Sequence, residues 1–229
     1  MQSMARYLDA AALKPEMTTQ EVLEAIRISI VHECKTICVR PCDIDLAVKH
    51  CAGTKTGVSC VLAFPHGTAS ARAKLLEAED SARPGVMEID MVANYGLLRS
   101  GRDAEAEQEI RAIAALCHAR GVGLKVILET ALLTPEEIRR GVNLAVAAQA
   151  DFVKTSTGFA SGGASEAAVA LMLEAGQGRI AVKASGGIRD AAQAQRYIDM
   201  GCSRLGVNAA SVPALCGGGK VDGAGNSGY

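Results

Sequence analysis

The chain has 229 residues, a length that fits one domain near the upper end of single-domain size or two small domains. Lys and Arg number 24 and Asp and Glu number 25, so the net charge is −1 and we expect no nucleic-acid or membrane partner. Hydrophobic residues make up 49% of the chain, which excludes a disordered protein. Aromatic residues make up 3%, too few for a platform that stacks nucleic-acid bases.

The N-terminal residues and the cysteines indicate a reducing compartment. Met1 to Leu8 contain no long apolar core and no small-residue cleavage site, so we expect no signal peptide. Eight cysteines could form disulfides, but a chain of this size that is rich in aliphatic residues does not need them. Because the chain has no C-x-x-C pair and its four histidines do not cluster, we predict a cytoplasmic protein without a metal site.

Short apolar runs recur along the chain and predict buried strands. In chain order the predicted strands are Tyr7–Leu13, Ile37–Val39, Val58–Phe64, Val86–Val92, Leu124–Leu128, Phe152–Thr155, Ile180–Ala184 and Arg204–Val207. Segments with helical spacing of apolar residues lie between most of these runs, as at Val22, Ile26 and Ile30. Thr134 followed by Pro135 and two glutamates predicts the start of another helix.

This alternation predicts an α/β fold in which parallel strands are joined by right-handed crossovers. Eight repeats fit an eightfold (β/α) barrel, a TIM barrel, over residues 1–216, followed by a glycine-rich tail over residues 217–229. The alternative is an open doubly wound sheet. Its nucleotide fingerprint is missing, because Gly121-x-Gly123 follows a helix and leads into a strand, which is the wrong order.

Several predicted strands contain charged residues, although strands of a parallel barrel are normally apolar. These residues are Glu88, Asp90, Lys125, Lys154 and Lys183. They could form ion pairs that fill the barrel interior, since a buried charge needs a partner or a function. However, Lys154 and Lys183 lie near the C-terminal ends of their strands, where eightfold barrels place their active sites.

Two lysines on neighbouring strands suit Schiff-base chemistry. With an ordinary pKa near 10.4, a lysine is protonated at neutral pH and is not a nucleophile. A second ammonium about 5 Å away, at an effective dielectric constant of about 20, costs roughly 3 kcal/mol and lowers the pKa of one amine to about 8. Asp90 supplies a carboxylate that can relay protons through a water molecule. Lys154, Lys183 and Asp90 therefore predict a lysine-dependent aldolase or a related lyase.

Glycines after the seventh predicted strand indicate a phosphate site. Gly186 and Gly187 form a turn that leads into a helix, where free N–H groups can bind an anion. Arg189 follows this turn, and we expect it to join Lys125, Lys154 and Lys183 at one end of the barrel. Eightfold barrels commonly bind phosphate after strands seven and eight, where this turn and Asn208 lie, although an ordinary strand-to-helix turn is the alternative. Thr157 can contact substrate hydroxyls or cap a helix, and His66 lies in a loop where solvation is the simpler interpretation.

At these residues the sequence resembles the deoxyribose-phosphate aldolase family. The resemblance runs from Leu8 to about Gly206. Its segments are Leu8-Asp9 with Leu13-Lys14-Pro15, Cys38-Val39-Arg40-Pro41, Phe64-Pro65-His66-Gly67, Glu88-Ile89-Asp90-Met91-Val92, Leu124 to Thr130, Asp151 to Phe159, and Val182 to Arg189. The resemblance implies an eightfold barrel that reversibly cleaves 2-deoxyribose 5-phosphate to acetaldehyde and glyceraldehyde 3-phosphate, with no cofactor.

Carried over by motif, Lys154 is similar to the Schiff-base lysine of the family and Lys183 to the neighbour that favours its neutral form. Asp90 resembles the proton-relay carboxylate. Asp9, Lys125 and Thr157 resemble supporting positions in the substrate site. The resemblance also implies a homodimer as the assembly.

The sequence departs from the family pattern in two places. The family commonly has Asp-His-Thr in the first strand, whereas this chain has Asp9-Ala10-Ala11. After the eighth strand the family usually supplies serine hydroxyls to the phosphate, whereas this chain has Asn208 followed by Ala209-Ala210. We therefore expect a weaker grip on phosphate. The terminal Tyr229 resembles a tyrosine that reaches the active site in some members.

Two other functions stay open at this point. A related Schiff-base barrel lyase would act on a different or unphosphorylated aldehyde, and the altered first and eighth strands favour it. A non-catalytic phosphate-binding module would have kept only the scaffold, which the presence of Lys154, Lys183 and Asp90 together disfavours.

Overall fold

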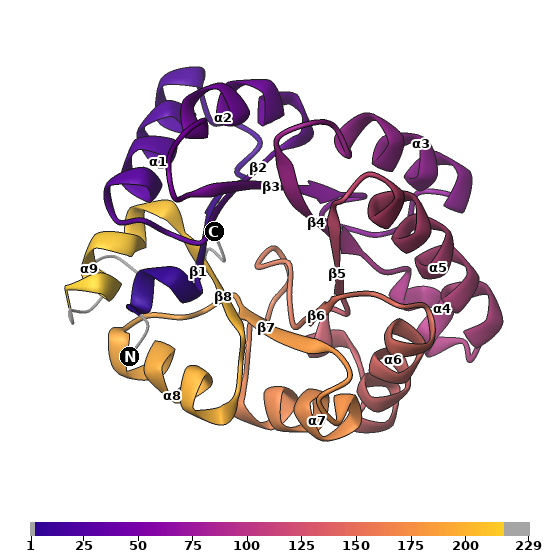
Figure 1. The fold of residues 1–229 in the computed structure, drawn as a ribbon. Helices are drawn as coiled ribbons and strands as arrows, with labels where there is room; N and C mark the ends of the chain where they lie inside the picture. The colour runs from indigo at the N-terminus through magenta and orange to yellow at the C-terminus, as the bar shows by residue number, and fades with distance from the viewer. Residues whose placement is uncertain (1–2, 218–229) are drawn as a thin grey trace.

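A computed structural model describes residues 3–217, and within this range eight strands close into a barrel. The strands follow one another around the barrel in chain order and all neighbouring pairs are parallel. The last strand pairs with the first, with Leu8 opposite Leu205. Figure 1 looks into this barrel, with the strands as an inner ring and the helices outside it. The predicted eightfold barrel is confirmed, and the open sheet is wrong.

Each strand overlaps one of the predicted apolar runs, with small differences at the ends. The strands are β1 (Leu8–Ala12), β2 (Thr36–Val39), β3 (Gly57–Leu62), β4 (Val86–Val92), β5 (Gly123–Ile127), β6 (Phe152–Lys154), β7 (Ala181–Ser185) and β8 (Arg204–Asn208). The run predicted to reach Phe64 ends at Leu62 because Ala63 has a left-handed backbone, with φ of 52°, which a strand does not accommodate.

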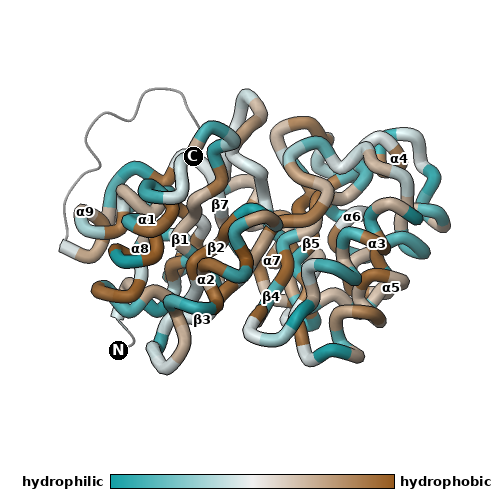
Figure 2. The backbone as a smooth tube through the Cα atoms, turned by 90° about the horizontal axis from the view of Figure 1, so that it is seen from above, coloured by the Kyte–Doolittle hydropathy of each residue, from teal (hydrophilic) through white to brown (hydrophobic). Residues whose placement is uncertain are grey.

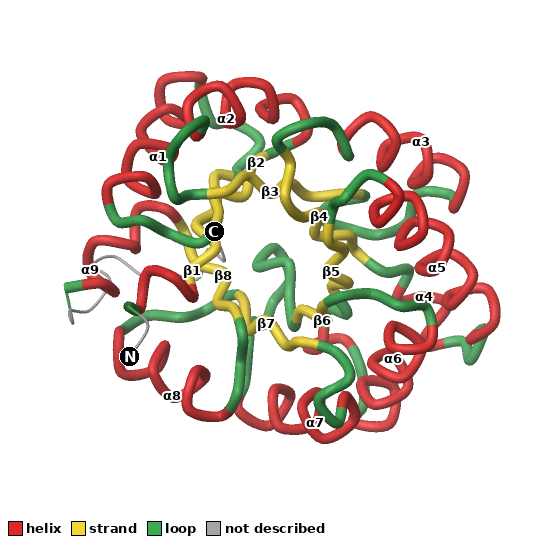
Figure 3. The backbone as a smooth tube through the Cα atoms, in the orientation of Figure 1, coloured by secondary structure: helices red, strands yellow, loops and turns green. Residues whose placement is uncertain are grey.

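Helices connect successive strands and cover the outside of the barrel (Figure 3). They are α1 (Thr19–Val31), α2 (Ile44–Cys51), α3 (Ala71–Ser81), α4 (Tyr95–Arg99), α5 (Asp103–Ala119), α6 (Pro135–Ala147), α7 (Glu166–Gly176), α8 (Ala191–Met200) and α9 (Val212–Cys216). Short 3₁₀ turns are η1 (Met4–Tyr7), η2 (Pro41–Asp43), η3 (Thr130–Leu132) and η4 (Ala209–Ser211). None of the helices within residues 3–217 is both long and apolar enough to cross a membrane.

Local sequence signals fix where α6 begins. The Thr134 hydroxyl accepts a hydrogen bond from the N–H of Glu137 (3.3 Å), and the Glu137 carboxylate accepts one from the N–H of Thr134 (2.7 Å). Pro135 occupies the first helical position, where its missing N–H costs nothing. This reciprocal capping confirms the predicted helix start. The outer helices alternate between hydrophilic and hydrophobic segments, as expected when one face is buried (Figure 2).

Side-chain alternation along the strands separates the core from the barrel interior. In β1, Leu8, Ala10 and Ala12 belong to the hydrophobic core between barrel and helices, so the intervening Asp9 and Ala11 point inward. In β4 the core holds Ile89 and Met91. Charged side chains at inward positions therefore come together inside the barrel.

Candidate active site

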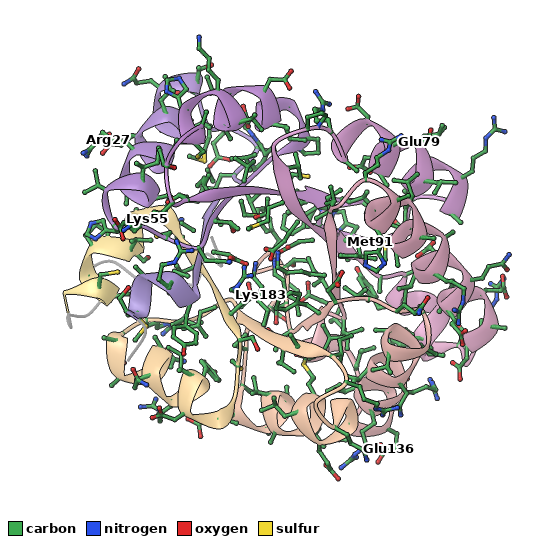
Figure 4. All side chains as sticks on the ribbon, in the orientation of Figure 1. Arg27, Lys55, Glu79, Met91, Glu136 and Lys183 are labelled. Carbon is green, nitrogen blue, oxygen red and sulfur yellow. The ribbon has the colours of Figure 1, made fainter. Side chains whose placement is uncertain are left out.

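Charged side chains from six of the strands meet inside the barrel. Each residue is at most 7% exposed. They are Asp9 on β1, Glu88 and Asp90 on β4, Lys125 on β5, Lys154 on β6, Lys183 on β7 and Arg204 on β8, and we call them the charged cluster. In Figure 4, Lys183 lies in the barrel interior, whereas Arg27, Glu79 and Glu136 project from the outer helices. The structure thus brings the predicted residues Asp9, Asp90, Lys125, Lys154 and Lys183 together.

Asp90 is the carboxylate that joins the three lysines. Its Oδ2 accepts hydrogen bonds from the Nζ atoms of Lys154 (2.9 Å) and Lys183 (2.8 Å). Its Oδ1 accepts one from the Nζ of Lys125 (2.9 Å). Because Lys154 and Lys183 contact the same oxygen atom, their two nitrogen atoms lie within about 6 Å of each other, close enough for mutual electrostatic repulsion.

The other half of the cluster lies nearer the N-terminal ends of the strands. The Arg204 guanidinium donates two hydrogen bonds to Glu88 (2.7 and 3.0 Å) and one to Asp9 (2.8 Å). The same guanidinium lies 5.3 Å from the ring centroid of Phe152, two residues before Lys154 on β6. Lys125 Nζ also contacts Glu88 (2.5 Å). Arg204 and its two carboxylates therefore form a layer beneath the lysine amines.

The charges in the cluster alter the ionisation of its members. Burial alone would raise the pKa of Asp90, but the ammonium groups of Lys125, Lys154 and Lys183 outweigh burial and hold that pKa well below 3.8. Burial lowers the pKa of Lys125 and of Lys183, but the carboxylates of Asp90 and Asp9 outweigh it, and both pKa values are raised above 10.5. Lys125 and Lys183 are therefore held in the charged form.

Thr157 is positioned by Glu129, a residue that the sequence did not single out. Glu129 follows β5 with a left-handed backbone (φ 57°), and its Oε2 accepts hydrogen bonds from the Thr157 N–H (3.1 Å) and from the Thr157 hydroxyl. Burial raises the pKa of Glu129 although the bonds from Thr157 lower it. Thr157 Oγ1 in turn accepts the N–H of Phe159 (3.1 Å). These bonds shape the loop after β6, which turns toward the centre of the barrel ring (Figure 3).

The predicted phosphate residues lie at the same end of β7 and β8. Gly186 and Gly187 both have left-handed backbones, with φ of 84° and 74°. The carbonyl oxygen of Gly186 accepts the N–H of Ala164 (3.0 Å), whereas no acceptor within residues 3–217 pairs with the N–H of Gly187, which is exposed. Asn208 Oδ1 accepts the N–H of Ala210 (2.9 Å), so the Asn208 amide nitrogen carries the donors. The turn is thus suited to an anion.

An apolar wall faces the barrel mouth from β1 to β3. Ala11, Leu13, Cys38 and Val61 form a small buried cluster against which Phe64 packs. Ala11 and Cys38 are direct neighbours across β1 and β2. The Phe64 ring meets the Phe159 ring edge to face, with centroids 5.2 Å apart. The mouth therefore has an apolar side opposite its glycine turn.

Some expectations differ from the structure. Arg189, which follows the glycine turn, is exposed and lies outside the charged cluster, whereas Arg204 takes the buried position. His66 is exposed, in agreement with the interpretation of a solvated loop histidine. Thr157 does not cap the next helix, because Ser165 does. Tyr229 lies outside the described residues. The eight cysteines are free, and no group of three potential His, Cys, Asp or Glu metal ligands occurs in the described part of the chain.

Arg204, Glu88 and Glu129 are the site residues that sequence reasoning missed or left without a role. A signal existed for Arg204, because it begins a buried strand just as Lys125 interrupts one. For Glu129 the sequence carried no such signal, since a glutamate after a strand is ordinarily solvated.

The family model of the DeoC/LacD family aldolases matches residues 2–217. The chain belongs to this family. It is 39% identical over 207 residues to the deoxyribose-phosphate aldolase of Bacillus subtilis, covering 90% of this chain and 92% of that protein. It is 40% identical over 204 residues to the deoxyribose-phosphate aldolase of Lactiplantibacillus plantarum, covering 89% and 95%.

The fold of this chain is also similar to that of solved aldolase structures. A tetrameric deoxyribose phosphate aldolase from Aeropyrum pernix superposes with a TM-score of 0.84 at 27% identity, and the match covers 93% of this chain and 89% of that one. The chain is therefore an aldolase by family, and the resemblance inferred from its motifs is confirmed.

Proposed function

We propose that this DeoC/LacD aldolase reversibly cleaves 2-deoxy-D-ribose 5-phosphate to acetaldehyde and D-glyceraldehyde 3-phosphate through a Schiff base on Lys154. The observation that carries the proposal is the pair of buried amines, Lys154 and Lys183, that contact one oxygen of Asp90. The relatives named deoxyribose-phosphate aldolase support the choice of substrate.

In cleavage, the neutral Lys154 amine attacks the C1 carbonyl of the open-chain sugar and the carbinolamine loses water to give an iminium. The C3 hydroxyl then gives up its proton and becomes a carbonyl as the C2–C3 bond breaks. The electron pair of that bond forms the enamine, so the iminium is the electron sink. Protonation at C2 and hydrolysis release acetaldehyde and return Lys154 as an amine.

Asp90 and Lys183 take supporting roles in this scheme. Asp90 contacts both amines, so its carboxylate can relay protons, through a water molecule, for the carbinolamine and enamine steps. Lys183 stays charged and its repulsion favours the neutral form of Lys154. Asp9 and Lys125 hold Lys183 and Asp90 in place through their ion pairs.

A turnover assay tests the proposed function directly. We expect the chain to release acetaldehyde from 2-deoxyribose 5-phosphate and to form the sugar phosphate from the two aldehydes, without an added cofactor. Acetaldehyde is measured with a coupled dehydrogenase. A chain that is folded but turns over neither this sugar nor its relatives would be the non-catalytic phosphate-binding module.

The lack of hydroxyl groups in the phosphate subsite favours a second candidate function. This candidate is a related Schiff-base lyase that acts on unphosphorylated aldehydes. The N–H groups of the Gly186-Gly187 turn and the Asn208 amide can hold a phosphate, but Ala209 and Ala210 offer no hydroxyl. Each missing hydrogen bond to a charged group is worth about 1.5–3 kcal/mol, or roughly tenfold to a hundredfold in affinity.

We therefore expect the phosphate to improve kcat/KM by less than about a thousandfold over deoxyribose. The measurement compares kcat/KM on the two sugars. Ala209→Ser and Ala210→Ser, which add a hydroxyl, should each widen the preference, with Ala214→Ser on α9 as a control that should not. A wild-type preference above this bound would contradict the weak phosphate grip.

We also propose that residues 1–216 form one barrel domain and that the chain is a cytoplasmic homodimer. The free cysteines are consistent with a reducing compartment. The side chains of Val31 and Leu76 are 63% and 56% exposed. They offer apolar surface for a contact between copies of the chain. Sedimentation over a range of concentrations distinguishes a dimer from a monomer or from a tetramer such as that of the Aeropyrum pernix protein.

A further inference from the structure

Glu129 is a buried carboxylate that has no part in the scheme above. It directly follows β5 and is 2% exposed. Its backbone is left-handed, with φ of 57°, a strained conformation for a residue other than glycine. Its Oε2 accepts both the N–H and the hydroxyl of Thr157, and its Oε1 has no hydrogen-bond partner within residues 3–217. Because burying a carboxylate and straining its backbone both cost free energy, this arrangement points to a function.

The contacts of Thr157 fix the direction of its hydroxyl group. A threonine hydroxyl has one proton to donate and two lone pairs that accept. One lone pair accepts the N–H of Phe159 (3.1 Å), and the proton points to Oε2 of Glu129. One lone pair remains. Thr157 can therefore accept a hydrogen bond from a substrate hydroxyl, but it cannot donate one.

This direction is the same whether or not Glu129 is ionised. Burial raises the pKa of Glu129, whereas the hydrogen bonds from Thr157 lower it. The carbonyl oxygen of a carboxylic acid is a better acceptor than its hydroxyl oxygen. The N–H of Thr157, 3.1 Å from Oε2, therefore fixes Oε2 as the accepting oxygen and leaves any acid proton on Oε1. The Thr157 hydroxyl donates to Oε2 in both forms.

The chemistry of the cleavage identifies the substrate group that such an acceptor suits. Thr157 lies three residues after Lys154, in the loop that turns toward the centre of the barrel ring (Figure 3). At C3 the hydroxyl becomes a carbonyl, which has no proton to donate. The C4 hydroxyl remains a hydroxyl in the sugar phosphate and in glyceraldehyde 3-phosphate. An acceptor that is fixed in direction can therefore bind C4 throughout the reaction, but not C3.

We propose that Glu129 is a positioning residue that fixes Thr157 as the hydrogen-bond acceptor for the C4 hydroxyl of the sugar. In the direction of synthesis this hydroxyl lies on carbon 2 of the electrophilic aldehyde, so the enzyme selects 2-hydroxyaldehydes. This role depends on the proposed cleavage through Lys154. Glu129 acts through Thr157 and does not itself contact the substrate.

The test compares two electrophilic aldehydes in the direction of synthesis, with acetaldehyde as the donor. D-Glyceraldehyde 3-phosphate has the hydroxyl at carbon 2, and 3-oxopropyl phosphate lacks only this group. We expect kcat/KM of the wild-type chain to be about tenfold to a hundredfold higher with the hydroxylated aldehyde, because the other leaves the buried Thr157 oxygen unpaired. Thr157→Val removes that oxygen and keeps the shape of the side chain, so the preference should fall to less than about threefold.

Three variants of Glu129 separate positioning from structure. Glu129→Met leaves the Thr157 hydroxyl in place but free to rotate, so the preference should fall by about fivefold. Glu129→Asp, whose carboxylate is one methylene shorter, should have the same effect and serves where the methionine variant does not fold. Glu129→Gln has an amide oxygen that can accept both bonds from Thr157, so the preference should be retained.

Glu109→Met is the matched control. Glu109 is also a buried glutamate, but it lies on α5 and binds Lys74 of α3, outside the site. We expect this variant to be destabilised, because Lys74 loses its partner, and yet to keep the wild-type preference. Thermal melts establish that each variant is folded at the assay temperature.

The outcomes distinguish this role from the proposed function. Equal losses with both aldehydes in Glu129→Met and Glu129→Asp would mean that Glu129 only holds the loop, and would overturn the role. A preference that persists in Thr157→Val, or a wild-type chain that turns over without any preference, also overturns it. A wild-type chain with no turnover and no borohydride-trapped adduct on Lys154 overturns the proposed function, and the role of Glu129 with it.

Discussion

The Lys154→Met variant is expected to lose aldol turnover by at least about four orders of magnitude, because it lacks the nucleophile that forms the iminium. Acetaldehyde and borohydride should leave a reduced adduct on Lys154 in the wild-type chain and none at this position in the variant. The measurement is peptide mass spectrometry of the trapped protein. An adduct on Lys125 or Lys183 in the wild-type chain would contradict the assignment.

Lys154→Met should not destabilise the protein, although it inactivates it. Asp90, which Lys154 contacts, keeps its hydrogen bonds from Lys125 and Lys183, and methionine is an apolar side chain of similar length. We expect the free energy of unfolding to be unchanged or to rise by about 1 kcal/mol. Urea unfolding of both chains measures this difference, and a loss of several kcal/mol would contradict the expectation that Lys125 and Lys183 suffice to pair Asp90.

Lys74→Met is the matched control, because Lys74 is also a fully buried lysine but lies on α3, outside the site. Its Nζ contacts Glu109 (2.6 Å) and the carbonyl oxygen of Val92 (3.0 Å). Its loss leaves Glu109 buried without its cation, so we expect about 3 kcal/mol of destabilisation. Below its melting temperature the variant should still form the adduct on Lys154.

The Asp90→Asn variant should lose both activity and stability. Asparagine cannot accept protons from the reacting groups, so we expect turnover to fall by about three orders of magnitude. Lys125, Lys154 and Lys183 lose the carboxylate that they all contact, and removing one partner from a buried ion pair costs about 3–5 kcal/mol. Asp80→Asn, at an exposed ion pair with Arg83, should change stability by less than about 1 kcal/mol.

The destabilisation of Asp90→Asn should depend on pH in a defined direction. The folded chain holds the pKa of Asp90 well below the ordinary value of 3.8, so this carboxylate stabilises the fold at any pH above 3.8. That contribution is lost as the pH falls below 3.8. The difference in unfolding free energy between wild type and variant should therefore be constant near neutrality and shrink in acid, as urea titrations at several pH values will show.

The barrel and most of the charged cluster could be predicted from the sequence for one physical reason. Strands that are covered on both faces should be apolar, so five of the seven members stood out as charges inside apolar runs: Glu88, Asp90, Lys125, Lys154 and Lys183. The eightfold repeat then placed the strands' C-terminal ends at one site. The prediction of the barrel and the prediction of the common site do not depend on which side chains contact each other.

The partners within the site could not be predicted, because they are far apart along the chain. Arg204 meets Asp9 across 195 residues and Glu88 across 116, and these pairs depend on barrel closure and on the depth of each side chain in the barrel. Arg189 was expected in the cluster on its position after the glycine turn, but it is exposed. Glu129 acquires its role from a left-handed backbone that places its carboxylate against Thr157.

The sequence by itself therefore determined the fold class, the family resemblance and the chemical nature of the site, because apolar periodicity and charges within buried runs are local properties. The net charge of −1 could not reveal the charged cluster buried in the barrel. Only the tertiary structure decided that Asp90 joins the three lysines and that Arg204 lies beneath them, because ion pairing between strands depends on register, burial and barrel closure.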